Sequence, residues 1–355
     1  GIYQTTFTGT IVGSNAITAK IDGLKVISKT APIKVTAGQL SYANSLVTVS
    51  APSVKAGTRI VVTFQPRDAA GNILTNQKGL PVSFALGANS TAQGTFTGAI
   101  YNKITGTYTA TFTGTIVGGS TIATTVNGQP ITSTPPVISV TPGTASAAKS
   151  ILAAFGGTTQ VVSGSAITLT LQAVDAYGNL ETAGGLAVAF KLVSAKGGLG
   201  TFSKVTDNKN GTYSVTFTGT IAGSNTIEAT IAGVKVTATV AVTVTPGSYS
   251  LAKSVVTVAK PGSVAPGKTI AVLLQTKDAA GNNLTTDLLG SETISFALAN
   301  STGGKGTFSA ATYMGNGEYE ATFTATNAGS NLVAALIESS KVTSKAPAII
   351  VTAAI

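Results

Sequence analysis

The residues that could do chemistry in this chain are few. Among its 355 residues there is no histidine and no cysteine, so thiol nucleophiles, histidine-based triads and nitrogen or sulfur metal ligands are unavailable. Glu318 and Glu320 flank Tyr319, which puts two carboxylates on one strand face and could pair them for acid and base work. If Tyr319 points inward, both glutamates point to water, and neither has a counterpart elsewhere in the chain. We therefore predict no catalytic residue and no enzymatic activity.

A second candidate is a phosphate-binding loop. Residues 262–269 read Gly-Ser-Val-Ala-Pro-Gly-Lys-Thr, the pattern in which glycine amides cradle phosphates and a lysine reaches their terminal oxygens. That chemistry needs a helix after the loop, whereas Thr269 runs into alternating apolar residues that predict a strand. The corresponding stretches 56–59 and 163–166 keep the turn without the lysine. We predict a turn here and no nucleotide or other cofactor.

Calcium is the third chemistry to weigh, because Asp68, Asp175 and Asp278 recur at equivalent points. Ca²⁺ takes six to eight oxygen ligands with several carboxylates. No second acid lies within four residues of Asp68 or Asp278, and Asp175 is followed only by Glu181, six residues on. The runs Asp-Ala-Ala-Gly-Asn and Asp-Ala-Tyr-Gly-Asn fit a turn in which the carboxylate caps backbone amides. We predict turn caps and no metal site.

These candidates recur because the chain itself is repetitive. The phrase Gly-x-Tyr-x-x-x-Phe occurs four times, and its tyrosines lie 105, 105 and 106 residues apart. They are Tyr3, Tyr108, Tyr213 and Tyr319. The Asp-x-x-Gly-Asn runs and a closing Val-Thr-x-Gly keep the same spacing. A fixed period close to one domain length indicates an array of similar domains, each with its own core.

The closing glycines Gly38, Gly143 and Gly247 place the boundaries of the repeats. The predicted domains are the C-terminal strands of an incomplete repeat at 1–38 and three full repeats at 39–143, 144–247 and 248–355. Seven residues after each closing glycine comes a serine, at Ser45, Ser150 and Ser254. The junctions are therefore short, and neighbouring repeats should touch and bend little.

Apolar residues within a repeat alternate, as in Ile60, Val62 and Phe64 before Asp68. This period of two predicts strands with one buried face. With turn signals every 8 to 12 residues or so, it predicts an all-β fold of tandem immunoglobulin-like antiparallel β-sandwiches in an elongated array. No stretch predicts a helix. The recurring tyrosine is either a corner residue whose hydroxyl bonds back to the chain or a core packing residue.

The motifs resemble those of a known family. Asp-Ala-Ala/Tyr-Gly-Asn, Gly-x-Tyr-x-x-x-Phe, Gly-Ser-Asn-x-Ile (residues 13–17 and 223–227) and Val-Thr-Pro-Gly are similar to bacterial immunoglobulin-like repeats of the invasin and intimin type, and also to filamin-type repeats. The Gly-Pro-Gly-Leu stretch that often opens filamin repeats is absent. The resemblance covers nearly the whole chain. It implies a fold and a bacterial surface protein, but such motifs specify no ligand.

Composition narrows the compartment and the partners. Without cysteine there are no disulfides, so each repeat must be held by its hydrophobic core. The net charge of +10 comes from lysines spread singly, without the basic cluster that nucleic-acid binding uses, so we predict no nucleic-acid partner. No apolar run of about 18 residues predicts a transmembrane segment. We expect an extracellular location at the cell surface.

Signals for sugars are weak. The chain has no tryptophan, and many of its Phe and Tyr residues fall at core-like positions, so no aromatic platform for sugar binding is evident. Sequons for N-glycosylation occur at Asn89, Asn210, Asn283 and Asn300 and matter only in a host that uses them. The specific ligand cannot be read from the sequence.

Residues 1–38 raise a separate question. They would supply the last two or so strands of a sandwich, and a strand pair this small is marginal alone in water. Either a longer chain supplies the missing strands before Gly1, or a neighbouring molecule donates them and so builds a filament. We expect the first.

Together these features predict a structural stalk or fibre segment of an extracellular adhesin or appendage. Its partners would be like domains of the same or neighbouring chains. The alternative is a binding module that captures a partner's strand at a sheet edge. An unblocked edge strand in each repeat would favour this alternative, whereas edges that carry lysine would count against it.

Overall fold

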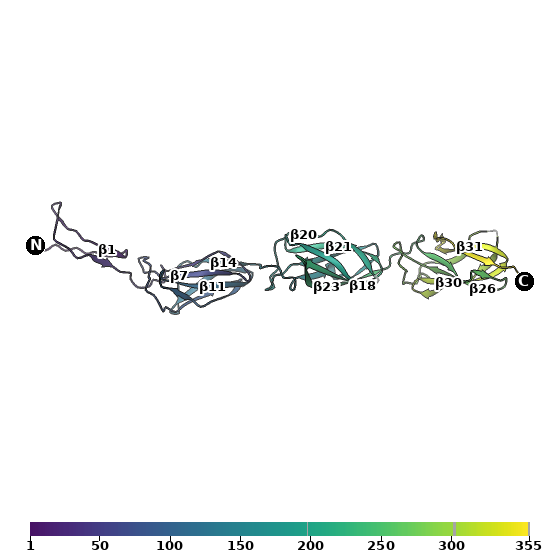
Figure 1. The fold of residues 1–355 in the computed structure, drawn as a ribbon, viewed down its shortest axis with the longest axis horizontal. Helices are drawn as coiled ribbons and strands as arrows, with labels where there is room; N and C mark the ends of the chain where they lie inside the picture. The colour runs from purple at the N-terminus through teal and green to yellow at the C-terminus, as the bar shows by residue number, and fades with distance from the viewer. Residues whose placement is uncertain (197, 301–302, 354–355) are drawn as a thin grey trace. The chain divides into compact units, whose positions relative to one another are not determined.

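The computed structural model describes residues 1–196, 198–300 and 303–353 (Figure 1). Within these ranges the chain is built from β-strands, and the one helix is a single 3-10 turn, η1 at Phe155–Gly157. The prediction of an all-β fold of tandem immunoglobulin-like domains is confirmed. In the part of the chain so described, no helix has the length and apolar character needed to span a membrane.

The strands follow one another closely along the chain. Those of residues 1–38 are β1 Gly13–Asn15, β2 Lys20–Ile21, β3 Leu24–Lys25 and β4 Ile33–Val35. Those of residues 39–143 are β5 Leu46–Val49, β6 Ser53–Lys55, β7 Arg59–Gln65, β8 Val82–Leu86, β9 Gln93–Phe96, β10 Ile100–Asn102, β11 Thr107–Ile116, β12 Gly118–Val126, β13 Gln129–Pro130 and β14 Val137–Thr141.

The next two repeats use the same order of strands. Those of residues 144–247 are β15 Ile151–Ala154, β16 Gln160–Val162, β17 Ala166–Gln172, β18 Val188–Lys196, β19 Leu199–Phe202, β20 Thr206–Asp207, β21 Thr212–Ile221, β22 Gly223–Ile231 and β23 Val234–Thr245. The last repeat has β24 Val255–Val258, β25 Ser263–Val264, β26 Thr269–Gln275, β27 Ile294–Leu298, β28 Lys305–Phe308, β29 Thr312–Gly315, β30 Glu318–Asn327, β31 Gly329–Ile337, β32 Ser340–Lys341 and β33 Ala348–Val351.

The chain divides into two compact units. The first unit comprises Gly1–Lys149 and Ala173–Thr182, and the second comprises Ser150–Gln172 and Ala183–Ile355. The short segment Ala173–Thr182 falls in the first unit although the repeat pattern assigns it to residues 144–247. Its hydrogen bonds to residues of the preceding repeat, described below, explain this placement.

In the first unit, residues 39–143 form a sandwich of two sheets. One sheet has the order β10-β11-β7-β5, with β9 also on β11, and the other has the order β13-β12-β14-β6, with β8 also on β12. Figure 1 labels β7, β11 and β14 in this sandwich. Val62, Phe64, Phe112 and Ile138, which come from both sheets, are fully buried in one cluster. The alternating residues therefore fill a single core, as the period of two predicts.

The second unit contains two more sandwiches of the same kind. The first has sheets β15-β17-β21-β19, with β20 on β21, and β16-β23-β22-β18. The second has sheets β24-β26-β30-β28, with β29 on β30, and β25-β33-β31-β27, with β32 on β31. Leu171 and Phe217 are fully buried in the first of these sandwiches, and Leu274 and Phe323 occupy the equivalent positions in the second.

One strand pair in each repeat departs from the predicted antiparallel layout. β6 runs parallel to β14, and β16 with β23 and β25 with β33 are parallel in the same way. The cause is a split first strand. β5 pairs with β7 in one sheet, Pro52 interrupts the strand, and the chain continues as β6 beside the last strand in the other sheet. The prediction was thus right for the hairpins and wrong for this crossing strand.

The recurring tyrosine is both a core residue and a corner residue. Tyr213 and Tyr319 are at most 1% exposed. In each repeat the hydroxyl accepts a backbone N–H, at 2.9 Å from Leu80 to Tyr108, 2.9 Å from Leu186 to Tyr213 and 2.6 Å from Leu288 to Tyr319. Burial raises the pKa of Tyr319 to about 12, so its hydroxyl keeps its proton. Both readings of the tyrosine therefore hold.

Residues 1–38 form two small antiparallel pairs, β1 with β4 and β2 with β3. Residues 1–10 belong to no strand, although their sequence repeats that of β11. The segment thus contains the predicted last strands of a repeat without the sheets that would flank them.

Candidate functional site

The three turns that carry the recurring aspartates form the candidate site. In the first of them, the Asp68 N–H donates to the Asn72 carbonyl at 3.0 Å, and the Gly71 N–H donates to the Asp68 carbonyl at 3.0 Å. Gly71 has φ of 85°, a conformation that glycine adopts without strain. The turn is therefore tight, and it presents the side chains of Asp68 and Asn72 to their surroundings.

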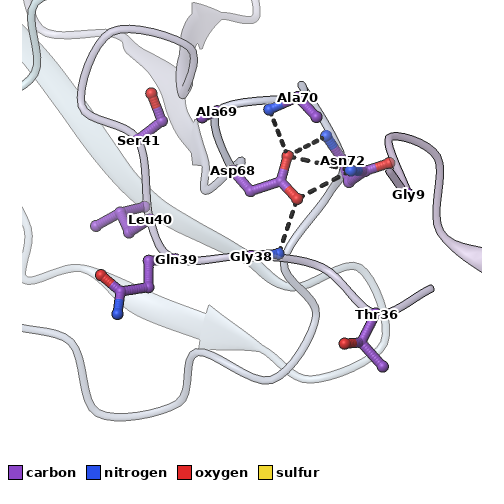
Figure 2. Close-up of a pocket in the computed structure, with 10 residues that line it drawn as sticks. All are labelled: Gly9, Thr36, Gly38, Gln39, Leu40, Ser41, Asp68, Ala69, Ala70 and Asn72. Atoms are coloured by element: carbon purple, nitrogen blue, oxygen red, sulfur yellow. Dashed lines mark hydrogen bonds between the residues drawn. The ribbon is translucent and has the colours of Figure 1, made fainter. Parts of the chain in front are cut away.

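The Asp68 carboxylate caps this turn and reaches beyond it (Figure 2). One oxygen accepts the N–H groups of Ala70 and Asn72 at 2.9 and 2.8 Å, and the other accepts the N–H of Gly38 at 2.9 Å. Asn72 Nδ2 donates to the second oxygen at 2.9 Å. Gly38 is the closing glycine before this repeat, so the carboxylate ties the turn to the chain that enters it.

The Asn72 carboxamide makes a second connection. Its Nδ2 donates to the Thr10 carbonyl at 2.9 Å, and its Oδ1 accepts the Val12 N–H at 3.2 Å. Thr10 and Val12 belong to residues 1–38. A single side chain thus binds a carbonyl and an N–H of the preceding segment at the same time.

The second turn makes the same contacts within the first unit. Asp175 Oδ2 accepts the Gly143 N–H at 2.8 Å and the Asn179 Nδ2–H at 2.8 Å. Asn179 Nδ2 also donates to the Thr115 carbonyl at 2.8 Å, and Asn179 Oδ1 accepts the Val117 N–H at 2.9 Å.

The third turn repeats the arrangement within the second unit. Asp278 Oδ2 accepts the Gly247 N–H at 3.0 Å. Asn282 Nδ2 donates to the Thr220 carbonyl at 2.9 Å, and Asn282 Oδ1 accepts the Ala222 N–H at 2.8 Å. We call each such set a joint: the aspartate, the asparagine four residues later, the closing glycine, and the carbonyl and N–H that the asparagine binds.

Burial makes each joint depend on its own donors. Asp175 and Asp278 are at most 1% exposed, and Asn179 and Asn282 are 7% and 8% exposed. A buried polar group without a partner costs about 1–3 kcal/mol, so every bond in the joint must be made. At the second joint the chain also needs glycine, because a Cβ on Gly143 would lie 2.6 Å from the Ala56 carbonyl oxygen.

The recurring serine holds the turn in place. Ser45 is fully buried, and its Oγ accepts the Arg67 N–H at 3.0 Å, one residue before Asp68. Ser254 Oγ accepts the Lys277 N–H at 3.0 Å in the same way. The residues that follow a closing glycine are therefore fixed against the strand that leads to the aspartate.

Hydrogen bonding keeps the joint carboxylates ionised. The Gly38 N–H, with smaller contributions from Asn72 and Ala70, lowers the pKa of Asp68 from 3.8 to about 2. Burial alone would raise the pKa of Asp175 and of Asp278, but the hydrogen bonds from Asn179 or Asn282 and from the closing glycine outweigh it and lower both pKa values.

The prediction of a turn cap is confirmed, and it was incomplete. The aspartate oxygens accept N–H groups, which fits a cap and does not fit a calcium cradle of several carboxylates. Over residues 1–196, 198–300 and 303–353, no three acidic side chains gather as metal ligands. Burial, followed by the charge of Asp175, raises the pKa of Glu181. Sequence reasoning missed the connection to the preceding repeat, whose signal was the shared spacing of the turn and the closing glycine.

The phosphate-loop pattern is a turn between two strands. The Gly267 N–H donates to the Ala325 carbonyl at 2.8 Å, and Thr269 opens β26. This is the predicted strand in place of the helix that phosphate binding needs.

The glutamates of β30 lie where the alternation places them. Tyr319 is fully buried, and Glu318 and Glu320 are half-buried on the opposite face. They stand across from Gln275 and Leu273 on β26. The inward direction of Tyr319 is confirmed, and the absence of a catalytic role remains a prediction.

The sequon asparagines are accessible. Asn89, Asn210, Asn283 and Asn300 are all exposed. The sequon at Asn300 continues into residues 301–302, which lie outside the described residues.

The sandwiches define the class of protein, tandem immunoglobulin-like domains, and comparisons with known proteins narrow it. The family model described as invasin, domain 3, matches residues 145–247. The solved structure of the Escherichia coli adhesin FdeC is 25% identical, with a TM-score of 0.51, over 90% of this chain and 100% of that one. These two findings confirm the resemblance to bacterial immunoglobulin-like repeats of the invasin type.

Further solved structures are similar at lower scores. InvD of Yersinia pseudotuberculosis is 24% identical, with a TM-score of 0.44, over 88% of each chain. Invasin, described as a bacterial integrin-binding protein, is 22% identical, with a TM-score of 0.43, over 86% of this chain and 60% of that one. None of the curated proteins matches the chain.

Asn282→Ala should loosen the third joint without unfolding its repeat. The change removes the partners of the Thr220 carbonyl and the Ala222 N–H, at a cost of about 1–3 kcal/mol. Hydrogen exchange should therefore speed up at Ala222 by about tenfold or more. The matched control is Asn283→Ala, whose side chain bonds Lys277 and Gln275 of its own repeat. Equal effects of the two changes would contradict the joint.

Acid should open the first joint only well below the ordinary pKa of aspartate. Because folding lowers the pKa of Asp68, its contribution to stability is full above 3.8 and is lost as the pH falls through about 2. Nuclear magnetic resonance with labelled glycine should show the Gly38 amide titrating with a midpoint near 2. Asp68→Asn should abolish this titration, and a midpoint near 3.8 would mean that the hydrogen bond is absent in solution.

Proposed function

We propose that this chain is a stalk segment of a bacterial cell-surface adhesin. The repeats at 39–143, 144–247 and 248–355 would be its domains, and residues 1–38 the last strands of a further one. The observation that carries the proposal is the recurrence of the same joint at all three junctions, with each contact at 2.8–3.2 Å. The similarity of residues 145–247 to invasin domain 3 supports the adhesin class.

The joint suits a stalk because it restrains two movements. The aspartate holds the closing glycine, which is the covalent link between repeats, and the asparagine holds a point away from that link. Two separate attachments oppose bending and twisting more than a peptide link alone. Compact scaling gives each repeat a diameter of roughly 30 to 40 Å, so three restrained repeats in line would reach on the order of 100 Å.

The proposal assigns reach to this chain and assigns it no reaction. It includes no catalytic residue, cofactor, metal or nucleic acid. Its partners are like domains in the same or a neighbouring chain, its location is the outside of the cell, and recognition of any host molecule would occur at another part of the adhesin.

Growth into a filament by strand complementation is the finer form of this proposal. Residues 1–38 would be the acceptor, and a neighbouring molecule the donor. In the described residues, each full repeat pairs its own strands in two sheets, so a donor copy would have to open one of its repeats. Polymerisation stays a prediction, and the self-association measurement in the next subsection tests it.

Distances between spin labels test the stalk. The chain has no cysteine, so Lys204→Cys and Lys341→Cys, both at exposed positions, would provide the only two labels. If the third joint restrains its repeats, the distance distribution in the parent chain is narrow, and Asn282→Ala broadens it because the attachment away from the covalent link is lost.

The control and the contrary result are clear. Asn283→Ala should leave the distribution narrow, since its bonds lie within one repeat. A broad distribution in the parent chain would contradict a restrained stalk, whatever the variants do.

A second candidate function is capture of a partner strand at a sheet edge. β8 and β27 each pair on one side only, with β12 and β31, in the part of the chain that the structure describes. Their sequences, VSFAL and ISFAL, carry no charge. The equivalent strand β18 carries Lys191, which discourages pairing. The edges of two repeats therefore fit strand capture better than that of the third.

Binding to cells separates the two candidates. Beads coated with the chain should bind cultured epithelial cells no better than albumin-coated beads if the chain is only a stalk. Binding that is lost in Ser83→Lys with Ala85→Lys, where the lysines would line the β8 edge, would instead favour strand capture.

A further inference from the structure

Residues 1–38 reproduce the second half of a repeat, residues 106–143, at a constant offset of 105. We call residues 1–38 the half-repeat. Gly13 stands opposite Val35 in the half-repeat, as Gly118 stands opposite Val140 in the full repeat. The same holds for the short hairpin, where Ile21–Leu24 corresponds to Val126–Gln129. The strand register is therefore identical.

Finer contacts agree with the register. The Val26 N–H donates to the Ala19 carbonyl at 2.8 Å, as the Ile131 N–H donates to the Thr124 carbonyl at 2.9 Å. A Cβ added to Gly9 would lie 2.7 Å from Val35 Cγ2, and one added to Gly114 would lie 2.9 Å from Val140 Cγ2. The half-repeat thus already holds β1, β4 and the hairpin in the arrangement of a finished sandwich.

Its apolar face, in contrast, is bare. Tyr3 is 97% exposed and Phe7 is 52% exposed, whereas their counterparts Tyr108 and Phe112 are 3% and 0% exposed. Ile21 is 69% exposed, and its counterpart Val126 is buried. Burying an aromatic or large aliphatic side chain contributes about 1.5–3 kcal/mol, so several such contributions are available to whatever covers this face.

The full repeat shows what the covering element is. β7 and β9 pair with β11, β8 pairs with β12, and β6 pairs with β14. All of these partner strands come from residues 39–105. Since both sheets lack partners, one added strand cannot complete the sandwich, and the occupant must bring strands to both sheets.

We infer that the half-repeat is an acceptor for the first half of a repeat of this type. The occupant is a polypeptide segment with the strand set of residues 39–105, which places alternating apolar residues such as Val62 and Phe64 against Tyr3 and Phe7. The inference rests on the proposed function, because the completed sandwich adds one more repeat to the stalk. A second copy of this chain does not fit, because its first halves are already paired with its own second halves.

A graft tests the inference in the full chain. A copy of residues 39–105 is placed directly before Gly1, which recreates the Thr105–Gly106 connection of the natural repeat. Hydrogen exchange in peptides from residues 1–38 should slow by about a hundredfold or more, toward the protection of residues 106–143 in the same molecule.

The matched control carries Val62→Asp and Phe64→Asp in the grafted copy only. These charges would face the core, so the control graft should leave residues 1–38 as exchangeable as in the parent chain. An intact graft that gives no protection would overturn the inference. The label distances between positions 204 and 341 do not involve the half-repeat, so they show separately whether the stalk proposal has failed.

Self-association provides the remaining outcome. The parent chain should sediment as a monomer across a wide range of concentrations. If it instead forms larger species in which residues 1–38 become protected, a second copy is the occupant, and our choice of occupant is wrong.

Discussion

A carboxylate taken out of water must be matched by hydrogen-bond donors, and here the donors come from two different repeats. Asp175 and Asp278 are at most 1% exposed, and each accepts an N–H from the glycine that closes the preceding repeat. The turn cannot satisfy its aspartate alone. Finishing the fold of a repeat and attaching it to its predecessor are therefore the same event, which explains why the segment around Asp175 groups with the repeat before it.

The asparagine extends this constraint without demanding a particular neighbour. It binds a carbonyl and an N–H two residues apart, at Thr10 and Val12, Thr115 and Val117, or Thr220 and Ala222. Because these are main-chain groups, the side chains of the preceding repeat can vary as long as its backbone keeps its shape. A joint of this kind can be copied along an array while the surface of each repeat changes.

Much of this architecture can be predicted from local patterns. The alternation of Ile60, Val62 and Phe64 gives the strands, and the spacing of the tyrosines gives the repeats, because both depend on neighbours close in sequence. The partners of Asn72 and Asn179 lie 62 and 64 residues away, so no local pattern indicates them. The crossing of the first strand at Pro52 was missed for the same reason, since its consequence is pairing with β14 at the far end of the repeat.

That crossing strand also determines how a repeat meets tension. β6 lies near the start of its repeat and β14 near the end, and the two run side by side in the same direction. A pull on the two ends of the repeat drags these strands past each other along their length. The hydrogen bonds between them are then loaded together in shear, and they resist as a group where a hairpin pulled at its open end would yield one bond at a time. The parallel pair acts as a mechanical clasp inside each domain.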